Sequence, residues 1–529
     1  MTSGRFLIGA AAPSLLLAAL LAGCARPAPP PVPVAERKPD LPAIALKEAP
    51  AFPLPAHVES KDIAAGAYSF DRMFEAGSLL FHAAYNGLDG VGSAVREDGS
   101  RVARLAPPGP RGPHSQACGE CHNMPVAAAA GLAHSTVSEA KKGTTAVNAR
   151  SVPSLFGNGI LQLLAQEMTE ELQAVRAEAA SAAKTAPGTK VVRDLQSKGT
   201  RFGTIAATAT AGGQVAFDLS KVAGIDPDLV VKPMDWKGDA PLVRNLTLGA
   251  AAGGMGMVGD EIVWKKAGAG KHPDVDGDGV GRELSVGDVT AMTVYSAAQE
   301  TPVELGQLAS LGYVKEPSPE DAARVEAGRR AFAQVGCASC HTPQMPLLNT
   351  RFEEPTLRGN GHYYDAALAK LDPDYDPKRP FAFDILKDAQ PPRAEPRPEG
   401  GAIIRLYGDL KRHAMGRALA DPAGPSESFG ADSQPLKVNG KAVMIPADHF
   451  LTPELWGVGN TGPWLHDNRA GTLREAILLH GEDAPPPVGA PGRSEAQGAR
   501  DAFMKQSAAD QDAILAFLLS LRTFSPEKR

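Results

Sequence analysis

Cysteine, aromatic residues and excess basic charge are all scarce in this chain of 529 residues. Its five cysteines are too few for a disulfide scaffold in a protein of this length. There are 54 lysines and arginines against 60 aspartates and glutamates, so no basic surplus favours nucleic-acid binding. Hydrophobic residues make up 43% of the chain and charged residues 22%, which excludes a mainly disordered protein.

The first 23 residues have the pattern of an export signal. One basic residue, Arg5, precedes the apolar run from Phe6 to Leu21, and small residues follow it. The run contains Pro13 and is marginal for a helix of about 20 residues that spans a bilayer, and no later segment is long and apolar enough. We therefore predict a cleaved signal peptide over residues 1–23.

The residues after the apolar run predict a lipid anchor. Leu21-Ala22-Gly23-Cys24 resembles the lipobox of bacterial lipoproteins, in which the cysteine is lipidated and becomes the first residue. The alternative is that Cys24 is an ordinary residue in an uncleaved anchor. Residues 25–56 contain ten prolines, so we predict a tether over residues 24–58. The expected location is the periplasm, and Ala25 is compatible with sorting to the outer membrane.

The other four cysteines lie in two Cys-x-x-Cys-His motifs, which are Cys118 to His122 and Cys337 to His341. This is the attachment signature of c-type haem, because two thiols one helical turn apart can each bond a vinyl group while the histidine reaches the iron. A redox dithiol or half of a zinc site would leave the repeated histidine unexplained. The sequence therefore predicts two covalently bound haem c groups and no free thiol in the mature chain.

A short repeat precedes the two motifs. Gly77-x-x-x-Phe81 lies ahead of the first motif, and Gly328-x-x-x-Phe332 lies ahead of the second, in a helix that begins after Ser318. Strand signals are few, and aromatic residues make up only 5% of the chain. We therefore predict a mainly α fold with few short strands and two cytochrome c-like domains, each carrying a covalent haem, over residues 59–300 and 301–529.

Five further segments share features with a known family. They are residues 148–159 (NARSVPSLFGNG), 274–282 (DVDGDGVGR), 286–298 (VGDVTAMTVYSAA), 409–416 (DLKRHAMG) and 455–481 (LWGVGNTGPWLHDNRAGTLREAILLHG). Together they resemble the diheme oxidoreductases, a family labelled as peroxidases or thiol oxidoreductases and related to bacterial diheme cytochrome c peroxidases. The likeness covers roughly residues 60–525, and its last segment is the most specific.

The resemblance implies a division of labour between the two haems. His122 holds a haem that reacts with peroxide, and His341 holds a haem that relays electrons. The relay iron then needs two strong protein ligands, whereas the reactive iron needs an open or openable position. The expected partners are a small periplasmic electron donor of the cytochrome c or cupredoxin type, and hydrogen peroxide or an organic substrate.

The sixth ligand of the second haem is open at this point. In the related peroxidases a methionine immediately precedes the segment matching Gly462 to His466, whereas here that place is near Asn460, a poor iron ligand. The candidates are His480, Met415 and His413. A methionine near a helix is also common core filler, and a histidine at a helix end is also a favourable dipole partner.

Proton transfer to a bound peroxide requires a carboxyl or amide group near the reactive iron. Gln162, Glu167 and Glu170 are the candidates, with Glu171 beside them, because they follow the segment that resembles the peroxidase distal loop. The alternative for the glutamates is the solvated face of a helix. His134 could close the iron in a resting state, or it is an exposed loop residue.

The four tryptophans are candidates for carrying electrons between the haems or to the surface, although packing explains most buried aromatic residues. They are Trp236, Trp264, Trp456 and Trp464.

An acidic turn predicts a calcium ion. Asp274, Asp276 and Asp278, followed by a glycine, form the start of a calcium loop in which alternating carboxylates converge on a hard cation. Position twelve is Ser285 instead of glutamate, which excludes an EF-hand. Glu283 or backbone oxygens could complete the site, and an acidic turn without metal is the alternative. Diheme peroxidases often carry calcium, so the resemblance favours a bound ion.

We therefore expect a periplasmic, lipid-anchored diheme c-type oxidoreductase that reduces hydrogen peroxide with electrons from a small donor. A second hypothesis applies the same oxidising power to an organic or protein substrate. A third is an electron-transfer cytochrome in which both irons are saturated and no substrate reacts.

Overall fold

The computed structural model describes residues 56–91, 104–105, 108–109, 114–131, 137–140, 147–356, 371–430, 434–484 and 492–525. The predicted signal peptide, Cys24, most of the tether and His134 lie outside the described residues. All the described residues belong to one compact unit, residues 49–529. The predicted boundary between two haem domains at residue 300 stays a prediction.

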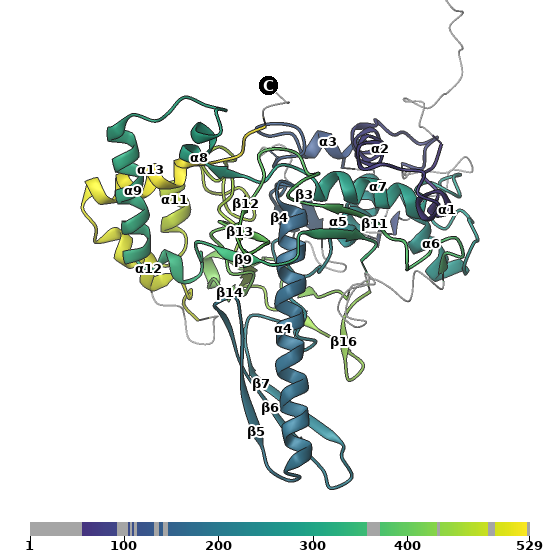
Figure 1. Ribbon diagram of the computed structural model, residues 1–529, viewed down its shortest axis with the longest axis horizontal. Coiled ribbons are helices and arrows are strands. Elements are labelled where there is room, and N and C mark those ends of the chain that lie inside the picture. The colour runs from purple at the N-terminus through teal and green to yellow at the C-terminus, as the bar shows by residue number, and fades with distance from the viewer. Residues whose placement is uncertain are drawn as a thin grey trace, which may run out of the picture. The chain divides into compact units, whose positions relative to one another are not determined.

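The longest helix of the described chain, α4, has 28 residues, and the others are markedly shorter (Figure 1). The α-helices are α1 (Ser60–Ala64), α2 (Phe70–His82), α3 (Cys118–Cys121), α4 (Asn158–Thr185), α5 (Val243–Ala250), α6 (Asp260–Ala267), α7 (Val286–Ala297), α8 (Leu305–Ser310), α9 (Pro319–Gln334), α11 (Leu473–Leu478), α12 (Gln497–Met504) and α13 (Ala508–Ser520). A π-helix over Ala251–Met255 continues α5, and 3-10 turns occupy Cys337–Ser339 and Arg417–Leu419.

The prediction of a mainly α fold made of two cytochrome c-like domains is wrong. The described residues contain twenty strands in nine antiparallel sheets, seven with two strands and two with three. Most of these strands are two to four residues long, so they leave no measurable alternation in the sequence. Strand β6, the longest, reads TRFGTIAATA, and its glycine and alanines have low strand propensity.

The strands pair as follows. The sheets are β1 (Arg104–Leu105) with β2 (Pro108–Gly109); β3 (Val137–Ala140) with β4 (Val147–Arg150); β5 (Val191–Ser197), β6 (Thr200–Ala209) and β7 (Val215–Val222); β8 (Val303–Glu304) with β20 (Leu521–Arg522); β9 (Met345–Leu347), β13 (Ala402–Ile404) and β12 (Glu395–Pro396); β10 (Arg351–Glu354) with β11 (Phe381–Asp384); β14 (Arg412–Ala414) with β19 (His449–Leu451); β15 (Ser426–Glu427) with β18 (Met444–Ile445); and β16 (Lys437–Val438) with β17 (Lys441–Ala442).

The same close helix crossing occurs beside both motifs. Helix α2 packs on α7, and α9 packs on α13. A Cβ on Gly77 of α2 would lie 2.1 Å from the carbonyl oxygen of Ala291 in α7. A Cβ on Gly328 of α9 would lie 1.9 Å from the carbonyl oxygen of Ala513 in α13. Only glycine at these two positions lets the helix backbones approach this closely, so the repeat predicted from the sequence is confirmed.

The phenylalanines of the repeat contact the motif histidines. The ring centroids of Phe81 and His122 are 6.0 Å apart, and those of Phe332 and His341 are 6.2 Å apart. Each helix crossing is therefore in contact with its Cys-x-x-Cys-His turn through the phenylalanine of the repeat.

A second, longer repeat is visible once the structure is known. Residues 151–157 (SVPSLFG) match residues 451–457 (LTPELWG), and residues 233–250 match residues 463–480 in the pattern P-x6-A-x3-R-x3-L. The first of these segments begins with an isolated antiparallel bridge between Met234 and Ala240 and continues into α5. The second begins with the same kind of bridge between Trp464 and Ala470 and continues into α11. In the second half of the chain these pieces are almost continuous. In the first half, α4 and the sheet β5–β6–β7, which lies beside it in Figure 1, are inserted between them.

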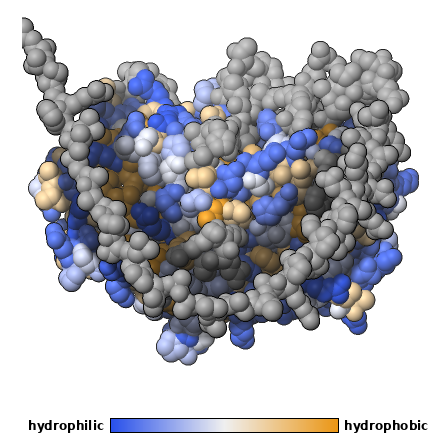
Figure 2. Space-filling model, turned by 90° about the horizontal axis from the view of Figure 1, so that it is seen from above, coloured by the Kyte–Doolittle hydropathy of each residue, from blue (hydrophilic) through white to orange (hydrophobic). Residues whose placement is uncertain are grey.

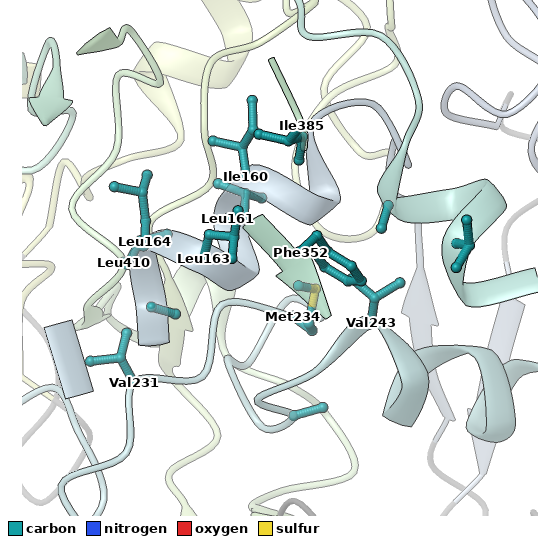
Figure 3. Close-up of a cluster of buried hydrophobic side chains, with 14 of the residues drawn as sticks. Ile160, Leu161, Leu163, Leu164, Val231, Met234, Val243, Phe352, Ile385 and Leu410 are labelled. Carbon is teal, nitrogen blue, oxygen red and sulfur yellow. The ribbon is translucent and has the colours of Figure 1, made fainter. Parts of the chain in front are cut away.

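The beginning of this insertion forms much of the main core (Figure 3). Buried side chains from α4 meet side chains from the segment before α5 and from the second half of the chain. They are Ile160, Leu161, Leu163, Leu164, Val231, Met234, Val243, Phe352, Ile385 and Leu410. Helix α4 therefore packs against segments from both halves of the chain.

On the face seen in Figure 2, hydrophilic residues cover much of the described surface, and hydrophobic residues show mainly in its recesses. Among the described helices, none combines the length and the apolar character that crossing a bilayer requires.

Replacing Gly328 by alanine should lower the free energy of unfolding by about 1–3 kcal/mol, because the new methyl group would overlap the Ala513 carbonyl oxygen. Gly306 of α8 is the matched control, since a Cβ there meets nothing within 4 Å. We expect Gly306→Ala to be neutral or slightly stabilising. Denaturant unfolding of both variants measures the difference, and equal effects would contradict the close crossing.

Candidate functional site

A cavity of about 590 Å³ adjoins the second motif, with Cys337, Cys340 and His341 in its wall. The motif forms a tight turn in which the His341 amide donates to the Cys337 carbonyl oxygen at 3.0 Å. His341 Nδ1 lies 2.9 Å from the carbonyl oxygen of Tyr407. Since a carbonyl only accepts, Nδ1 carries the proton and Nε2 keeps its lone pair.

His480, at the end of α11, lines the same cavity and is held in the same way. Its Nδ1 lies 2.7 Å from the carbonyl oxygen of Ala476, so its Nε2 is also a free lone-pair donor. Burial lowers the pKa of His480. Burial and then the neighbouring His480 lower the pKa of His341 to about 4. Both rings are therefore neutral at pH 7, which is the state that binds a metal.

His413 also lines the cavity, but both of its ring nitrogens are engaged by carboxylates. Nε2 lies 2.8 Å from Asp409 Oδ2, and Nδ1 lies 2.7 Å from Glu495 Oε2. Burial lowers the pKa of His413, but its hydrogen bonds, above all that to Asp409, outweigh burial and raise it to about 11. The ring is therefore an imidazolium without a free lone pair. Met415, the third candidate ligand, lines the cavity as well.

Part of the cavity wall is formed by Trp236, Phe450 and His466. The rings of Phe450 and His466 are stacked with centroids 4.2 Å apart. Trp236 Nε1 donates to Ser151 Oγ at 3.2 Å, and the Ser151 amide donates to the His466 carbonyl oxygen at 2.7 Å. These bonds join the matching segments of the two repeats around one cavity.

A buried ionic cluster lies next to these rings. Asp421 binds Arg150 in a bidentate pair, with distances of 2.6 and 2.8 Å, and its Oδ2 lies 3.2 Å from Lys237 Nζ. Burial raises the pKa of Asp421, but Arg150 and then Lys237 outweigh burial and lower this pKa overall. The cluster therefore places two cations and one anion beside Trp236 and Phe450, each of which has a cation over its ring.

The first motif is held by the same kind of bond. The His122 amide donates to the Cys118 carbonyl oxygen at 3.0 Å, and His122 Nδ1 lies 3.0 Å from the carbonyl oxygen of Pro153. Burial lowers the pKa of His122 to about 4, so this ring too is neutral with a free Nε2. Pro153 itself lines the cavity of the second motif. One residue therefore connects the two motif sites.

The two halves differ where His480 lies. In the longer repeat, His480 at the end of α11 corresponds to Ala250 at the end of α5, because both stand ten residues after the bridged alanine. The first half therefore has no imidazole at the position from which His480 faces His341.

The candidate proton-transfer residues on α4 serve other contacts. Gln162 Oε1 accepts from the Val243 amide at 2.8 Å. Glu167 is buried and accepts from the amides of Leu348 and Asn349 and from Lys198. Glu170 is exposed. These contacts fix α4 to its neighbours. Their catalytic role stays a prediction.

Three of the four tryptophans lie around the cavity, namely Trp236, Trp456 and Trp464. Trp456 packs directly on Gly157, where a Cβ would lie 2.2 Å from its ring. Trp264, on α6, is buried in a separate hydrophobic cluster. The structure therefore gathers three electron-relay candidates, and their role stays a prediction.

The acidic turn brings its three carboxylates together. One oxygen each from Asp274, Asp276 and Asp278 lies within 4.8 Å of the others. Burial and the neighbouring carboxylates raise the pKa of Asp276 to about 7. Glu283 Oε2 accepts from the Val258 amide at 2.6 Å, and burial, together with the nearby Asp276 and Asp278, raises the pKa of Glu283. The calcium site stays a prediction.

Sequence reasoning missed the residues that position the motif histidines. Tyr407 and Pro153 act through backbone carbonyls, which no side-chain pattern records. Glu454 in the cavity wall was also missed. The repeated P-x-L-x-G pattern of residues 153–157 and 453–457 was present in the sequence and could have located two of these segments.

Comparisons with known proteins leave the family unassigned. No known protein family and no curated protein matches the chain. Hydrazine synthase of Kuenenia stuttgartiensis, solved under xenon pressure, aligns with 91% of this chain and 98% of its own at 12% identity, with a TM-score of 0.32. A MauG-like protein associated with microbial copper homeostasis aligns with 60% of this chain and 78% of its own at 14% identity, with a TM-score of 0.28. At these TM-scores neither structure assigns a fold or a function.

Calcium should raise the melting temperature of the protein if the acidic turn binds it, because ligand binding to the folded state adds about 2.7 kcal/mol at one hundred times the dissociation constant. Asp276→Asn should abolish the shift, since it removes the carboxylate that lies between the other two. Asp376→Asn, in another turn, is the control. Thermal unfolding with calcium and with a chelator measures the effect, and identical curves would rule the site out.

Proposed function

We propose that the protein is a c-type haem oxidoreductase with two haems, attached at Cys118 and Cys121 and at Cys337 and Cys340. One observation carries this proposal. His341 of the second motif and His480 share one cavity, and in each ring Nδ1 is bonded to a backbone carbonyl, which leaves Nε2 free. Two neutral imidazoles facing one apolar cavity are the ligand set of a low-spin haem iron.

The cavity fits such a group. Its wall contains both thiols of the motif, His341, His480 and three tryptophans, and its volume is about 590 Å³. When bound, haem supplies one-electron redox chemistry, which the protein tunes through the ligands and the surrounding charges. Here His341 and His480 would hold the iron, and the neighbouring imidazolium of His413 would contribute charge without coordinating it.

The first motif supports a different role. His122 is fixed as a ligand by Pro153, but the counterpart of His480 is Ala250. An alanine offers no ligand at this place, which supports an iron with a position open to a small substrate. This asymmetry favours a reactive first haem fed by electrons from the second. We propose hydrogen peroxide as the substrate and a small periplasmic cytochrome c or cupredoxin as the electron donor.

The export signal and the lipobox-like segment around Cys24 support a periplasmic, lipid-anchored location, which is where c-type haem is attached to proteins. This part of the proposal rests on the sequence alone.

Replacing His480 by alanine tests the ligand pair. The variant should keep both haems but convert the second from a low-spin species to one that binds cyanide, and added imidazole should restore the original optical spectrum. His449→Ala, at a partly exposed histidine paired with Asp448 outside the cavity wall, is the matched control and should leave the spectrum unchanged. An unchanged spectrum in His480→Ala would show that another residue, Met415 first, binds the iron.

Peroxide turnover tests the substrate. The protein supplied with a reduced small cytochrome c should oxidise that donor when peroxide is added, at two electrons per peroxide consumed. Replacing Cys118 and Cys121 by serine should remove one haem and abolish this turnover. Donor oxidation that persists in this variant, or no oxidation by the unmodified protein, would refute the peroxidase assignment.

A further inference from the structure

Glu454 lies in the cavity wall on a segment held from both ends. The amide of Thr452 donates to the carbonyl oxygen of Lys411 at 3.0 Å, and the amide of Leu455 donates to that of Leu406 at 3.0 Å. Glu454 is therefore placed opposite the loop that supports the second motif histidine.

The backbone of Glu454 packs against Gly408 of that loop, where a Cβ would lie 3.5 Å from Glu454 Cα. On one side of Gly408 is Tyr407, whose carbonyl oxygen holds His341. On the other side is Asp409, which binds His413. Glu454 therefore lies in the wall of the same cavity as His341 and His480, although no role in the proposed ligand set falls to it.

The Glu454 carboxyl has no cation to stabilise its charge. Glu454 is partly buried, no ion pair in the part of the chain that the structure describes includes it, and loss of solvent around its carboxyl raises its pKa to about 7. The other ionisable groups of the cavity wall are either paired with an opposite charge or neutral. His413 is paired with Asp409 and Glu495, Arg500 is paired with Asp483 and Asp501, and burial keeps His466 neutral by lowering its pKa to about 4.

We propose that Glu454 binds a proton whenever the cofactor in this cavity gains an electron, and releases it on oxidation. This inference rests on the proposed function, because it requires a haem at Cys337 and Cys340. The step is balanced: one electron arrives from the small donor, one proton arrives from water, and the Glu454 carboxylate becomes a carboxylic acid. An added negative charge is costly in a poorly solvated cavity, and neutralising a nearby carboxylate offsets it.

The measured quantity is the reduction potential of the second haem as a function of pH, followed optically between pH 5 and 9. In the unmodified protein the potential should fall as pH rises around pH 7, by up to 59 mV per unit for one proton per electron. Glu454→Gln should flatten this dependence. Glu454→Asp should keep it, and Glu427→Gln, at an exposed glutamate outside the cavity wall, should behave like the unmodified protein.

The outcomes separate the two proposals. A slope that persists unchanged in Glu454→Gln would assign the proton to another group, such as a haem propionate, and would overturn the inference while leaving the haem site intact. A chain that holds no haem at Cys337 and Cys340, measured by haem content per chain, would overturn the proposed function itself. A slope lost in Glu454→Gln and kept in Glu454→Asp would establish the proton-binding role.

Discussion

The hydrogen bond between a histidine Nδ1 and a backbone carbonyl is the constraint on which the site depends. It fixes His122 through Pro153, His341 through Tyr407 and His480 through Ala476. Each bond places the proton on Nδ1 and leaves Nε2 as a lone-pair donor, and burial keeps the ring neutral. His413 shows the opposite result, because carboxylates at both nitrogens make it an imidazolium. The same side chain is therefore a neutral lone-pair donor or a fixed charge according to its acceptors.

Two unequal repeats position these bonds. Each half packs a glycine-containing helix against a second helix beside its motif, and each contains a bridged turn followed by a short helix. The halves then diverge in two ways that bear on function. The first half carries the insertion of α4 with its sheet, and it has Ala250 where the second has His480. This difference is the basis for proposing one saturated and one open site.

The sequence predicted the parts of the molecule that depend on local chemistry. Both motifs, the Gly-x-x-x-Phe repeat of Gly77 and Gly328, and the acidic turn follow from residue type and spacing, whereas the close helix contacts of the two glycines are found only in the structure. The mainly α fold was wrong because strands of two to four residues have no detectable period and form only when distant segments pair. The protonation state of His413 could not be predicted from the sequence either, since it depends on Asp409 and on Glu495, which is 82 residues away in the chain.

Electron paramagnetic resonance of the fully oxidised protein tests the central claim most directly, because it distinguishes an iron with two imidazole ligands from one with an open position. We expect one low-spin signal that peroxide does not alter and one high-spin signal that changes when peroxide is added. Two low-spin signals that are both inert to peroxide would contradict the account and would leave an electron carrier with two saturated irons.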